Sequence, residues 1–330
     1  MSTTTGAPPT IGGEPPPTAA EAFDRMAAAI GTVARCDPAS LRLILTAFAV
    51  GGHVLLEDLP GMGKTTLARA LAAVTGATAR RVQCTPDLLP SDITGVTIFN
   101  DRTREFEFHP GPVFANVVIV DEINRASPKT QSALLEVMQE EQVTVDGRAH
   151  PVPRPFLVVA TQNPIDLEGT FPLPEAQLDR FLMRLSLGHP GEEAELSLLR
   201  GTAPPVPEDL PLVLDGAQMA RLREAVEQVV FADRVYEYVI RLAQRTRRHP
   251  RLRAGVSMRA SIALCRTARM YALAEGRGHV VPEDVKALAG PVWAHRLVPM
   301  SGAATGPETA ELLDELLAEV PVPGPHENRS

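Results

Sequence analysis

Apolar residues follow two different spacings along this chain, and the change between them predicts where strands alternate with helices. Short uninterrupted apolar runs at 54–56, 117–120 and 156–161 are bounded by turn residues, which indicates strands buried on both faces of a sheet. Weaker strand patterns lie at 81–84 and 181–187. We therefore expect an α/β fold around a parallel sheet of five strands.

Apolar residues recur every three or four positions in the segments between these strands, which predicts helices there. Helical patterning begins near residue 21, whereas the Pro- and Gly-rich residues 1–20 predict a disordered tail. Alternating patterns at 97–108, and at 143–152 around the turn Asp146-Gly147, predict two β-hairpins.

The pattern is helical throughout the C-terminal part, and a break rich in Pro and Gly near residue 190 predicts a domain boundary. We expect a first domain at 21–190, a helical second domain at 191–320 and a flexible tail at 321–330. The candidate helices of the second domain span 191–201, 215–230, 233–247, 257–274, 282–295 and 307–317.

The stretch 53–68, HVLLEDLPGMGKTTLA, combines a strand, a turn rich in glycine and a helix that begins at Lys64. Backbone N–H groups of such a turn, the helix N-terminus and a lysine together bind phosphate. Asp58 stands where the usual pattern has its first glycine, and we expect Gly61 to supply the flexibility instead. An ordinary strand–turn–helix connection with a surface lysine is the alternative. The predicted nucleotide-binding residues are Pro60, Gly61, Met62, Gly63, Lys64, Thr65 and Thr66, with the hydroxyl of Thr65 on Mg²⁺.

Two carboxylates, Asp121 and Glu122, directly follow the strongest strand pattern. Ligands of open α/β sheets bind at the carboxyl ends of the strands. We expect Asp121 to hold Mg²⁺ through water, and Glu122 to orient and polarise the water that attacks the γ-phosphate. The alternative is that the two carboxylates cap the next helix. The upstream Gly-Lys-Thr favours the nucleotide-binding interpretation over this alternative. Asn163 ends another strand, where it contacts the γ-phosphate or is a turn residue only.

Composition narrows the class of protein further. Hydrophobic residues make up 44% of the 330 residues, enough to bury large cores, so a disordered protein is excluded. The formal net charge of −8 argues against a general DNA-coating surface. No signal peptide or membrane-spanning run is evident, and three separated cysteines, Cys36, Cys84 and Cys265, indicate a reducing cytoplasm. A solvated helix face, or a rim against an acidic neighbouring subunit, best explains Arg241, Arg245, Arg247, Arg248, Arg251 and Arg253.

Three long strings resemble the MoxR family of AAA+ ATPases, and the resemblance covers about residues 20–300. The strings are DEINRASPKTQSALLEVMQE at 121–140, ATQNPIDLEGTFPLPEAQLDRF at 160–181 and GVSMRAS at 255–261. The resemblance implies an AAA+ P-loop core followed by a small all-α lid, with ATP and Mg²⁺ as cofactors. It also implies a chaperone-like remodeller that hydrolyses ATP in a homo-oligomeric ring, by analogy a hexamer.

The resemblance assigns roles to four further residues. Asn163 matches the sensor-1 position, Arg180 the arginine finger that reaches a neighbouring subunit, and Arg259 the sensor-2 position on the lid. Gln83 is implied to modulate Glu122. Met258 stands where a proline commonly precedes the sensor-2 arginine, but neither this departure nor Asp58 removes a group that touches phosphate.

The predicted hairpins match, at about 96–110 and 143–152, the helix-2 insert and the pre-sensor-1 insert of this branch of ATPases. The resemblance suggests a separate partner chain with a von Willebrand factor A domain, and the first insert as the element that meets a client. Phe99, Phe106 and Phe108 are either contact residues there or the packing of the hairpin itself.

Two other functions compete with the remodelling ATPase. A DNA-translocating motor shares this insert branch, but the net charge of −8 and an insert tip of mixed charge argue against it. A non-hydrolysing nucleotide switch or scaffold is the second alternative, which the presence of Glu122, Asn163 and Arg180 disfavours.

Overall fold

The computed structural model describes most of the chain. The described residues are 17–34, 36–57, 63–163, 169–188, 196, 200, 205–300 and 307–324. Outside these ranges lie the predicted tail up to residue 16, the loop residues Asp58, Pro60, Gly61 and Met62, most of the predicted helix 191–201 and the end of the chain from 325.

The first helix, α1 (Ala19–Gly31), starts two residues before the predicted position. The last two residues of the expected tail, 19 and 20, therefore belong to this helix. Thr18 caps this helix, because its hydroxyl accepts a hydrogen bond from the Glu21 backbone N–H (3.3 Å) while the Glu21 carboxylate accepts one from the Thr18 N–H (2.8 Å). This reciprocal capping box satisfies two backbone donors that the helix leaves free.

The central sheet has five parallel strands, as the apolar runs predict. Their spatial order is β2 (Ala79–Gln83), β5 (Val117–Asp121), β8 (Leu157–Gln162), β1 (Val54–Glu57) and β9 (Met183–Leu185). Because β1 lies between the two strands that come last along the chain, the connections diverge on either side of it. Such a point is where open α/β sheets bind ligands.

Alternate residues of a strand enter two different hydrophobic cores. In β5, Val117 and Ile119 belong to one core, whereas Val118 and Val120 belong to the other. Both faces of the strand are therefore buried, which explains its unbroken apolar run.

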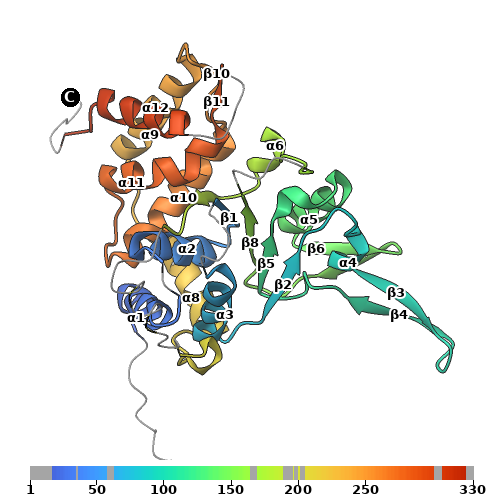
Figure 1. The fold of residues 1–330 in the computed structure, drawn as a ribbon. Coiled ribbons are helices and arrows are strands. Elements are labelled where there is room, and N and C mark those ends of the chain that lie inside the picture. The colour runs from blue at the N-terminus through green and yellow to red at the C-terminus, as the bar shows by residue number, and fades with distance from the viewer. Residues whose placement is uncertain are drawn as a thin grey trace, which may run out of the picture.

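The first core joins the sheet to the C-terminal region. It packs one face of the sheet against α1, α2 (Pro38–Val50) and α3 (Lys64–Thr75), and it continues into the C-terminal helices without a break. Figure 1 shows all of these helices on one side of the sheet, with α5 (Pro128–Glu140) on the other. The predicted boundary near residue 190 is thus crossed by one continuous apolar cluster.

The C-terminal region is a helical lid. Its helices are α8 (Gly216–Val226), α9 (Asp233–Arg248), α10 (Met258–Ala274), α11 (Pro282–Trp293) and α12 (Pro307–Glu319). The expectation that this region is purely helical is wrong in one detail, since β10 (Leu252–Ala254) pairs antiparallel with β11 (Val298–Pro299). Strands this short carry too few residues to show a period of two. Among the described residues, each helix is too short or too polar to cross a lipid bilayer.

Both predicted hairpins are present and extend away from the sheet (Figure 1). The first pairs β3 (Gly95–Asn100) with β4 (Glu105–Pro110), and the second pairs β6 (Gln142–Val145) with β7 (Arg148–Pro151). Asp146 and Gly147 form the turn of the second hairpin with positive φ angles of 51° and 74°. These are the left-handed conformations that the Asp-Gly sequence predicts for a two-residue hairpin loop.

Candidate functional site

Several of the sequence-predicted site residues lie at the carboxyl edge of the sheet. Parallel pairing aligns Gln83 at the end of β2 with Asp121 at the end of β5, and Glu57 at the end of β1 with Gln162 at the end of β8. Asn163 follows directly after β8 and is half-buried. Residues from four separate chain segments are thereby assembled along one edge.

Helix α3 begins immediately beyond this edge. Its N-cap, Gly63, has a left-handed conformation with a φ of 76° and, as glycine, offers no side chain to the first backbone N–H groups. Gly63 is exposed in the part of the chain that the structure describes. Lys64, Thr65 and Thr66 form the first turn and are half-buried. A helix N-terminus together with a lysine is an arrangement that binds phosphate.

A hydroxyl on the neighbouring strand positions the two carboxylates. The Thr161 hydroxyl accepts a hydrogen bond from the Glu122 backbone N–H (2.9 Å) and donates one to the Asp121 carboxylate (3.4 Å). Glu122 itself is left-handed, with φ 56° and ψ 53°. For a residue with a side chain, that backbone conformation costs about 1–3 kcal/mol and is typical of functional sites. The fold therefore holds Glu122 in a strained position just after β5.

Two arginines and one amide bind the carboxylates. The Arg81 guanidinium contacts the carboxylate of Asp121 (2.7 Å) and the amide oxygen of Gln83 (2.9 Å). Gln83 in turn donates to Glu122 (3.2 Å), and Arg125 donates to the same carboxylate oxygen (3.1 Å). The hydrogen bond between Gln83 and Glu122 is the contact that the implied modulating role requires. The sequence analysis missed the two arginines, because their partners are set by the pairing of β2 with β5 and by a local turn.

The donors at this edge fit a magnesium ion that arrives with a nucleotide. The Asp121 carboxylate and the Thr65 hydroxyl are hard oxygen ligands, which Mg²⁺ prefers, and it usually completes its shell with phosphate oxygens and water. Among the described residues, no three His, Cys, Asp or Glu side chains are grouped to hold a metal by themselves. A metal here would therefore share Asp121 with Arg81, or displace that arginine.

Cys84 is a small buried residue beside the carboxylates rather than a reactive thiol. Its side chain is 2% exposed, and its backbone N–H donates to the Asp121 carbonyl oxygen (3.0 Å). Burial, followed by the negative charges of Asp121 and Glu122, raises the pKa of the Cys84 thiol to about 12. A thiol with that pKa remains protonated and unreactive.

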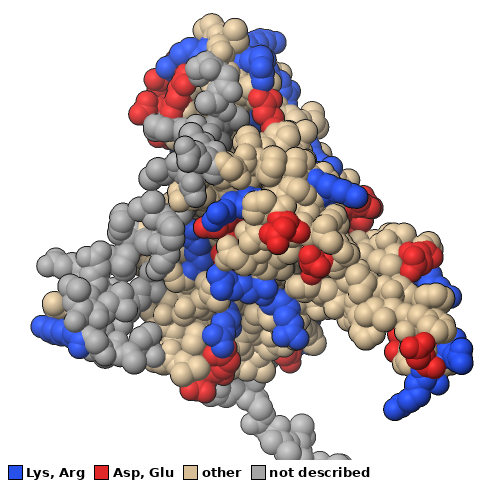
Figure 2. Space-filling model, turned by 45° about the vertical axis from the view of Figure 1, so that its right-hand side comes forward, with Lys and Arg blue, Asp and Glu red and all other residues tan. Residues whose placement is uncertain are grey.

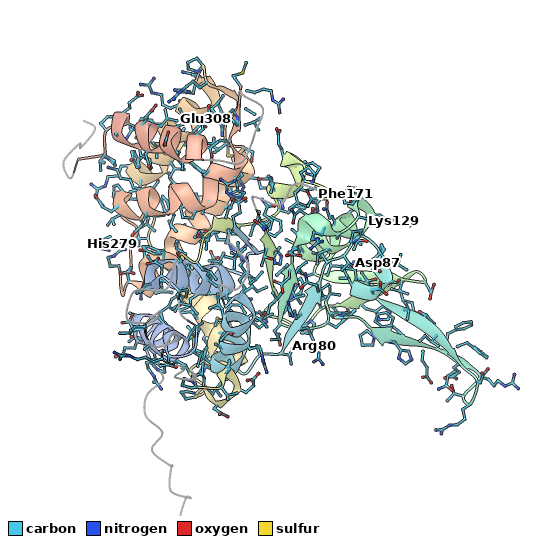
Figure 3. The ribbon with its side chains drawn as sticks, viewed as in Figure 1. Arg80, Asp87, Lys129, Phe171, His279 and Glu308 are labelled. Atoms are coloured by element: carbon cyan, nitrogen blue, oxygen red, sulfur yellow. The ribbon has the colours of Figure 1, made fainter. Side chains whose placement is uncertain are left out.

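A buried glutamine ties the loop after the carboxylates to a second segment. The Gln131 amide of α5 donates to the carbonyl oxygens of Ile123 (3.1 Å), Ala126 (3.2 Å) and Phe171 (2.9 Å). Phe171 also donates its backbone N–H to the Asn124 carbonyl (2.6 Å), and Figure 3 shows it beside α5. Gln131 was missed as well, since a single polar residue in a helix carries no periodic signal.

The two arginines implied by family resemblance lie on separate elements, Arg180 after α6 (Glu175–Leu178) and Arg259 in α10. Arg180 follows this short helix, is half-buried and donates to the Leu135 carbonyl (3.2 Å) and the Gln139 amide of α5. It borders a cavity of about 560 Å³. Arg259 is exposed in the first turn of α10, which Ser257 caps as predicted by accepting from the Ala260 N–H (3.1 Å).

Comparison with known proteins identifies the family. Residues 53–183 match the family described as ATPase family associated with various cellular activities (AAA), and residues 244–316 match the AAA lid domain. The chain is 44% identical over 258 residues to the chaperone MoxR1 of Mycobacterium tuberculosis, covering 75% of this chain and 68% of the relative. It is 32% identical over 311 residues to the protein MoxR of Methylorubrum extorquens, covering 86% and 90%. The chain belongs to the MoxR family of AAA+ ATPases.

Two further relatives span nearly the whole of this MoxR-family protein. YeaC of Bacillus subtilis, an uncharacterized protein, is 48% identical over 284 residues, covering 85% of this chain and 88% of YeaC. A crystal structure of a provisionally named ATPase from Cytophaga hutchinsonii superimposes with a TM-score of 0.84 at 35% identity, covering 93% and 96%. The predicted fold, an α/β AAA+ core with a helical lid, is therefore confirmed.

Proposed function

We propose that this MoxR-family protein binds and hydrolyses ATP with Mg²⁺, and couples hydrolysis in a ring oligomer to the remodelling of partner proteins. The observation that carries the proposal is that helix α3 starts at Lys64, after β1, in the same sheet whose carboxyl edge carries Asp121 and Glu122. Phosphoryl transfer needs mainly positioning and charge stabilisation, and these groups supply both.

The roles of the chain's residues follow from this chemistry. The loop 60–66, with Lys64, holds the phosphates, and Thr65 and Asp121 hold the magnesium ion, which supplies neutralising charge. Glu122 polarises the attacking water, and Asn163 orients it. Gln83 and Thr161 fix Glu122 from the two neighbouring strands.

We assign Arg180 to the active site of a neighbouring subunit and Arg259 to the nucleotide of its own subunit. Support for the first assignment is that Arg180 borders an open cavity on α5, outside the sheet edge that holds the carboxylates. An arginine that stabilises the transition state from another chain requires assembly, so a homo-oligomeric ring, by family analogy a hexamer, is part of the proposal.

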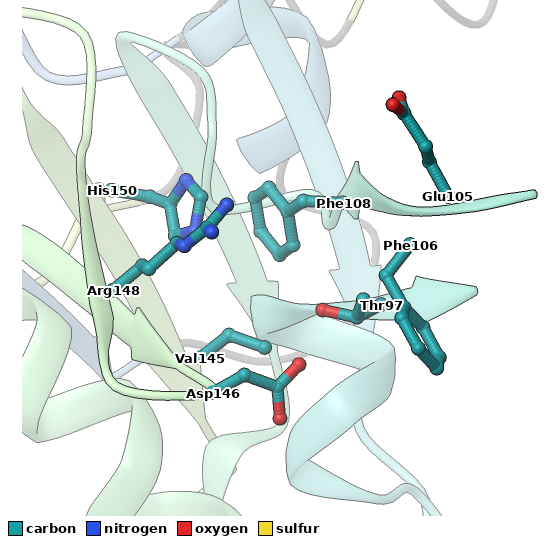
Figure 4. Close-up of a pocket in the computed structure, with 8 residues that line it drawn as sticks. All are labelled: Thr97, Glu105, Phe106, Phe108, Val145, Asp146, Arg148 and His150. Carbon is teal, nitrogen blue, oxygen red and sulfur yellow. The ribbon is translucent and has the colours of Figure 1, made fainter. Parts of the chain in front are cut away.

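The hairpin of β3 and β4 is the proposed site of client contact. Phe106 is 73% exposed and Phe99 is 42% exposed, although the two rings contact each other edge to face at 5.1 Å. Phe108 packs inward instead and stacks on His150 of the second hairpin at 4.1 Å. Figure 4 shows Phe108 facing His150, with Phe106 at the rim of the cavity of about 750 Å³ between the hairpins. A client with a von Willebrand factor A domain remains the partner that the family suggests.

We do not propose a DNA motor. In Figure 2, basic and acidic side chains lie together around the tip of the projecting hairpin. The arginine-rich stretch 241–253 is partly neutralised by glutamates in the pairs Arg245–Glu319, Arg251–Glu315 and Arg253–Glu175. Nucleic-acid affinity needs basic charge that is free to meet phosphates.

The test is the steady-state ATPase rate as a function of protein concentration, with sedimentation run in parallel. The wild type should gain specific activity as it assembles, whereas Arg180→Ala should bind ATP, assemble and stay slow. Arg245→Ala, which removes an exposed lid arginine, is the matched control and should behave as wild type. Turnover in Arg180→Ala equal to wild type would refute the trans assignment, absence of turnover at every concentration would favour the switch, and stimulation by added DNA would favour the motor.

A further inference from the structure

A lid arginine is buried against the segment that carries Arg180. Arg296 ends a short 3-10 turn (Ala294–Arg296) between α11 and β11, and its side chain is 5% exposed. Its guanidinium donates to the Asp179 carboxylate (2.7 Å), to the carbonyl oxygens of Phe181 (2.8 Å), Asp179 (3.2 Å) and Leu182 (3.2 Å), and to that of Val292 within the lid. The residues on both sides of Arg180 are therefore held from the lid.

The preceding residue reinforces the same contact. His295 is buried, and its Nε2 lies 3.1 Å from the Phe181 carbonyl oxygen, which can only accept a hydrogen bond. Nε2 therefore carries the proton. Burial, with the nearby charge of Arg296, lowers the pKa of His295 well below its usual value, so the ring is a neutral donor. Two successive lid residues thus converge on one backbone carbonyl of the core.

Within residues 179–182, the side chain of Arg180 points away from the lid. Its backbone lies between Asp179 and Phe181, while its guanidinium turns outward to α5. The direction in which an arginine projects depends on the backbone from which it starts. The lid contact therefore determines where Arg180 can reach.

The lid also carries Arg259, the residue proposed to contact the nucleotide of the same subunit. Arg259 lies close enough to Arg296 for its positive charge to contribute to the lowered pKa of that guanidinium, which burial chiefly causes. A nucleotide-dependent shift of the lid would therefore move Arg259 and Arg296 together.

We propose that Arg296 is a positioning residue for Arg180, so that the lid of each subunit sets the finger offered to its neighbour. The inference rests on the proposed trans role of Arg180. A guanidinium suits this task because its fixed fork of N–H donors engages a carboxylate and several carbonyl oxygens at once, which a lysine cannot reproduce.

A second lid arginine provides a matched control. Arg223 of α8 is half-buried and, like Arg296, donates to core backbone, at the carbonyl oxygens of Ala49 (2.8 Å) and Phe48 (2.9 Å). These carbonyls lie at the end of α2, far along the chain from Arg180. Loss of Arg223 weakens contact between lid and core without touching the finger segment.

The experiment uses mixed oligomers of full-length chains. Glu122→Gln subunits cannot hydrolyse ATP but can offer a finger, whereas Arg180→Ala subunits can hydrolyse but offer none. Equal mixtures of the two should recover turnover that neither has alone. Arg296→Gln is then added either to the finger-donating chain or to the hydrolysing chain, and Arg223→Gln is added to the donating chain as the control. ATP binding is measured for each variant by nucleotide titration.

We expect Arg296→Gln on the donating chain to lower the recovered rate at least about tenfold, since a misplacement of roughly 1 Å can cost ~10²-fold. The same change on the hydrolysing chain should leave the rate within about twofold, which also shows that the variant folds. Arg223→Gln should leave the recovered rate unchanged, and Arg296→Lys should restore little of the loss.

Three other results would overturn the inference in distinguishable ways. Equal losses on either chain would make Arg296 a general structural residue, and no loss on the donating chain would remove it from the finger. Failure of the parent mixture to recover any turnover would instead refute the trans role of Arg180, and the inference with it. Asp179→Asn on the donating chain provides the same test from the core side, because it removes the charge that Arg296 binds.

Discussion

The two ends of the same parallel sheet are built in opposite ways. At the carboxyl end, Asp121, Glu122 and Gln162 are half-buried, and Glu122 has a left-handed backbone. At the amino end, His53 is buried, accepts from the Val158 backbone N–H at Nδ1 (3.0 Å) and donates from Nε2 to the Met138 carbonyl (2.9 Å).

Asn116 completes the amino end. Its side-chain oxygen accepts from the Thr78 N–H (3.0 Å) and hydroxyl (3.1 Å), and its amide donates to the Pro155 carbonyl (2.9 Å). These contacts join β2, β5 and β8 where the strands begin. One end is thus bound by hydrogen bonds, whereas the other carries the groups of the proposed chemistry, so substitutions at the two ends should separate unfolding from turnover.

The largest effect is expected at the carboxyl end. Glu122→Gln should lower kcat at least ~10²-fold, because the amide cannot accept a proton from the attacking water. The free energy of unfolding should change by less than about 1 kcal/mol, since the ion pair with Arg125 is partly exposed. Single-turnover hydrolysis and chemical denaturation measure the two quantities. If Glu122→Gln still hydrolysed ATP at the wild-type rate, a group other than Glu122 would have to polarise the attacking water.

Asn116→Ala should give the reverse pattern. It removes three hydrogen bonds at the amino end and leaves the Thr78 N–H without its acceptor, which should destabilise the protein by about 1–2 kcal/mol. Turnover at a temperature where the variant is folded should equal that of wild type. A change in kcat without a change in stability would contradict the division between the two ends.

Acid should destabilise the amino end through His53. Burial, partly opposed by the bond to Met138, lowers the pKa of His53 to about 4, whereas the unfolded chain has the ordinary value of 6.5. The unfolded state therefore binds more protons between these values, so stability falls as the pH drops below about 6.5. Linkage gives a loss of about 1 kcal/mol at pH 5.5.

Denaturation at pH 5.5 and 7.5 tests this expectation, with His53→Gln as the comparison. The variant should show a smaller pH dependence than wild type, although His295, whose pKa is lowered for the same reason, should preserve part of it. An unchanged pH dependence would mean that His53 does not titrate on unfolding.

Gln83→Ala should produce the smallest effect. It removes one hydrogen bond to Glu122 at 3.2 Å, worth about 0.5–1 kcal/mol, so kcat should fall about two- to fivefold with no change in stability. A rise in kcat would instead mean that Gln83 restrains Glu122 in the resting subunit. Asn116→Ala, which removes a side-chain amide at the opposite end of the sheet, is the matched control variant.

Local patterns were sufficient for much of the fold. The unbroken apolar run before Asp121 predicted a strand buried on both faces, and Asp146-Gly147 predicted the hairpin turn, because each signal depends on neighbouring residues only. Failures occurred where elements were too short to repeat, as in β10 and β11, or where a cap extended a helix, as at Thr18.

The candidate site divides in the same manner. Lys64, Asp121 and Glu122 were identifiable because a turn, a helix start and a strand end are contiguous in sequence. Their partners were not, since Arg81 and Gln83 meet the carboxylates only through the pairing of β2 with β5.

The strands, the candidate phosphate-binding turn, the residue types of the candidate site and the family resemblance all follow from the order of residues along the chain. Tertiary structure alone decided the strand order that assembles the carboxyl edge, and the contact between Arg296 and the segment around Arg180. Short-range periodicity and hydrogen bonding are properties of adjacent residues, whereas contacts across more than a hundred residues exist only after packing has closed the intervening chain.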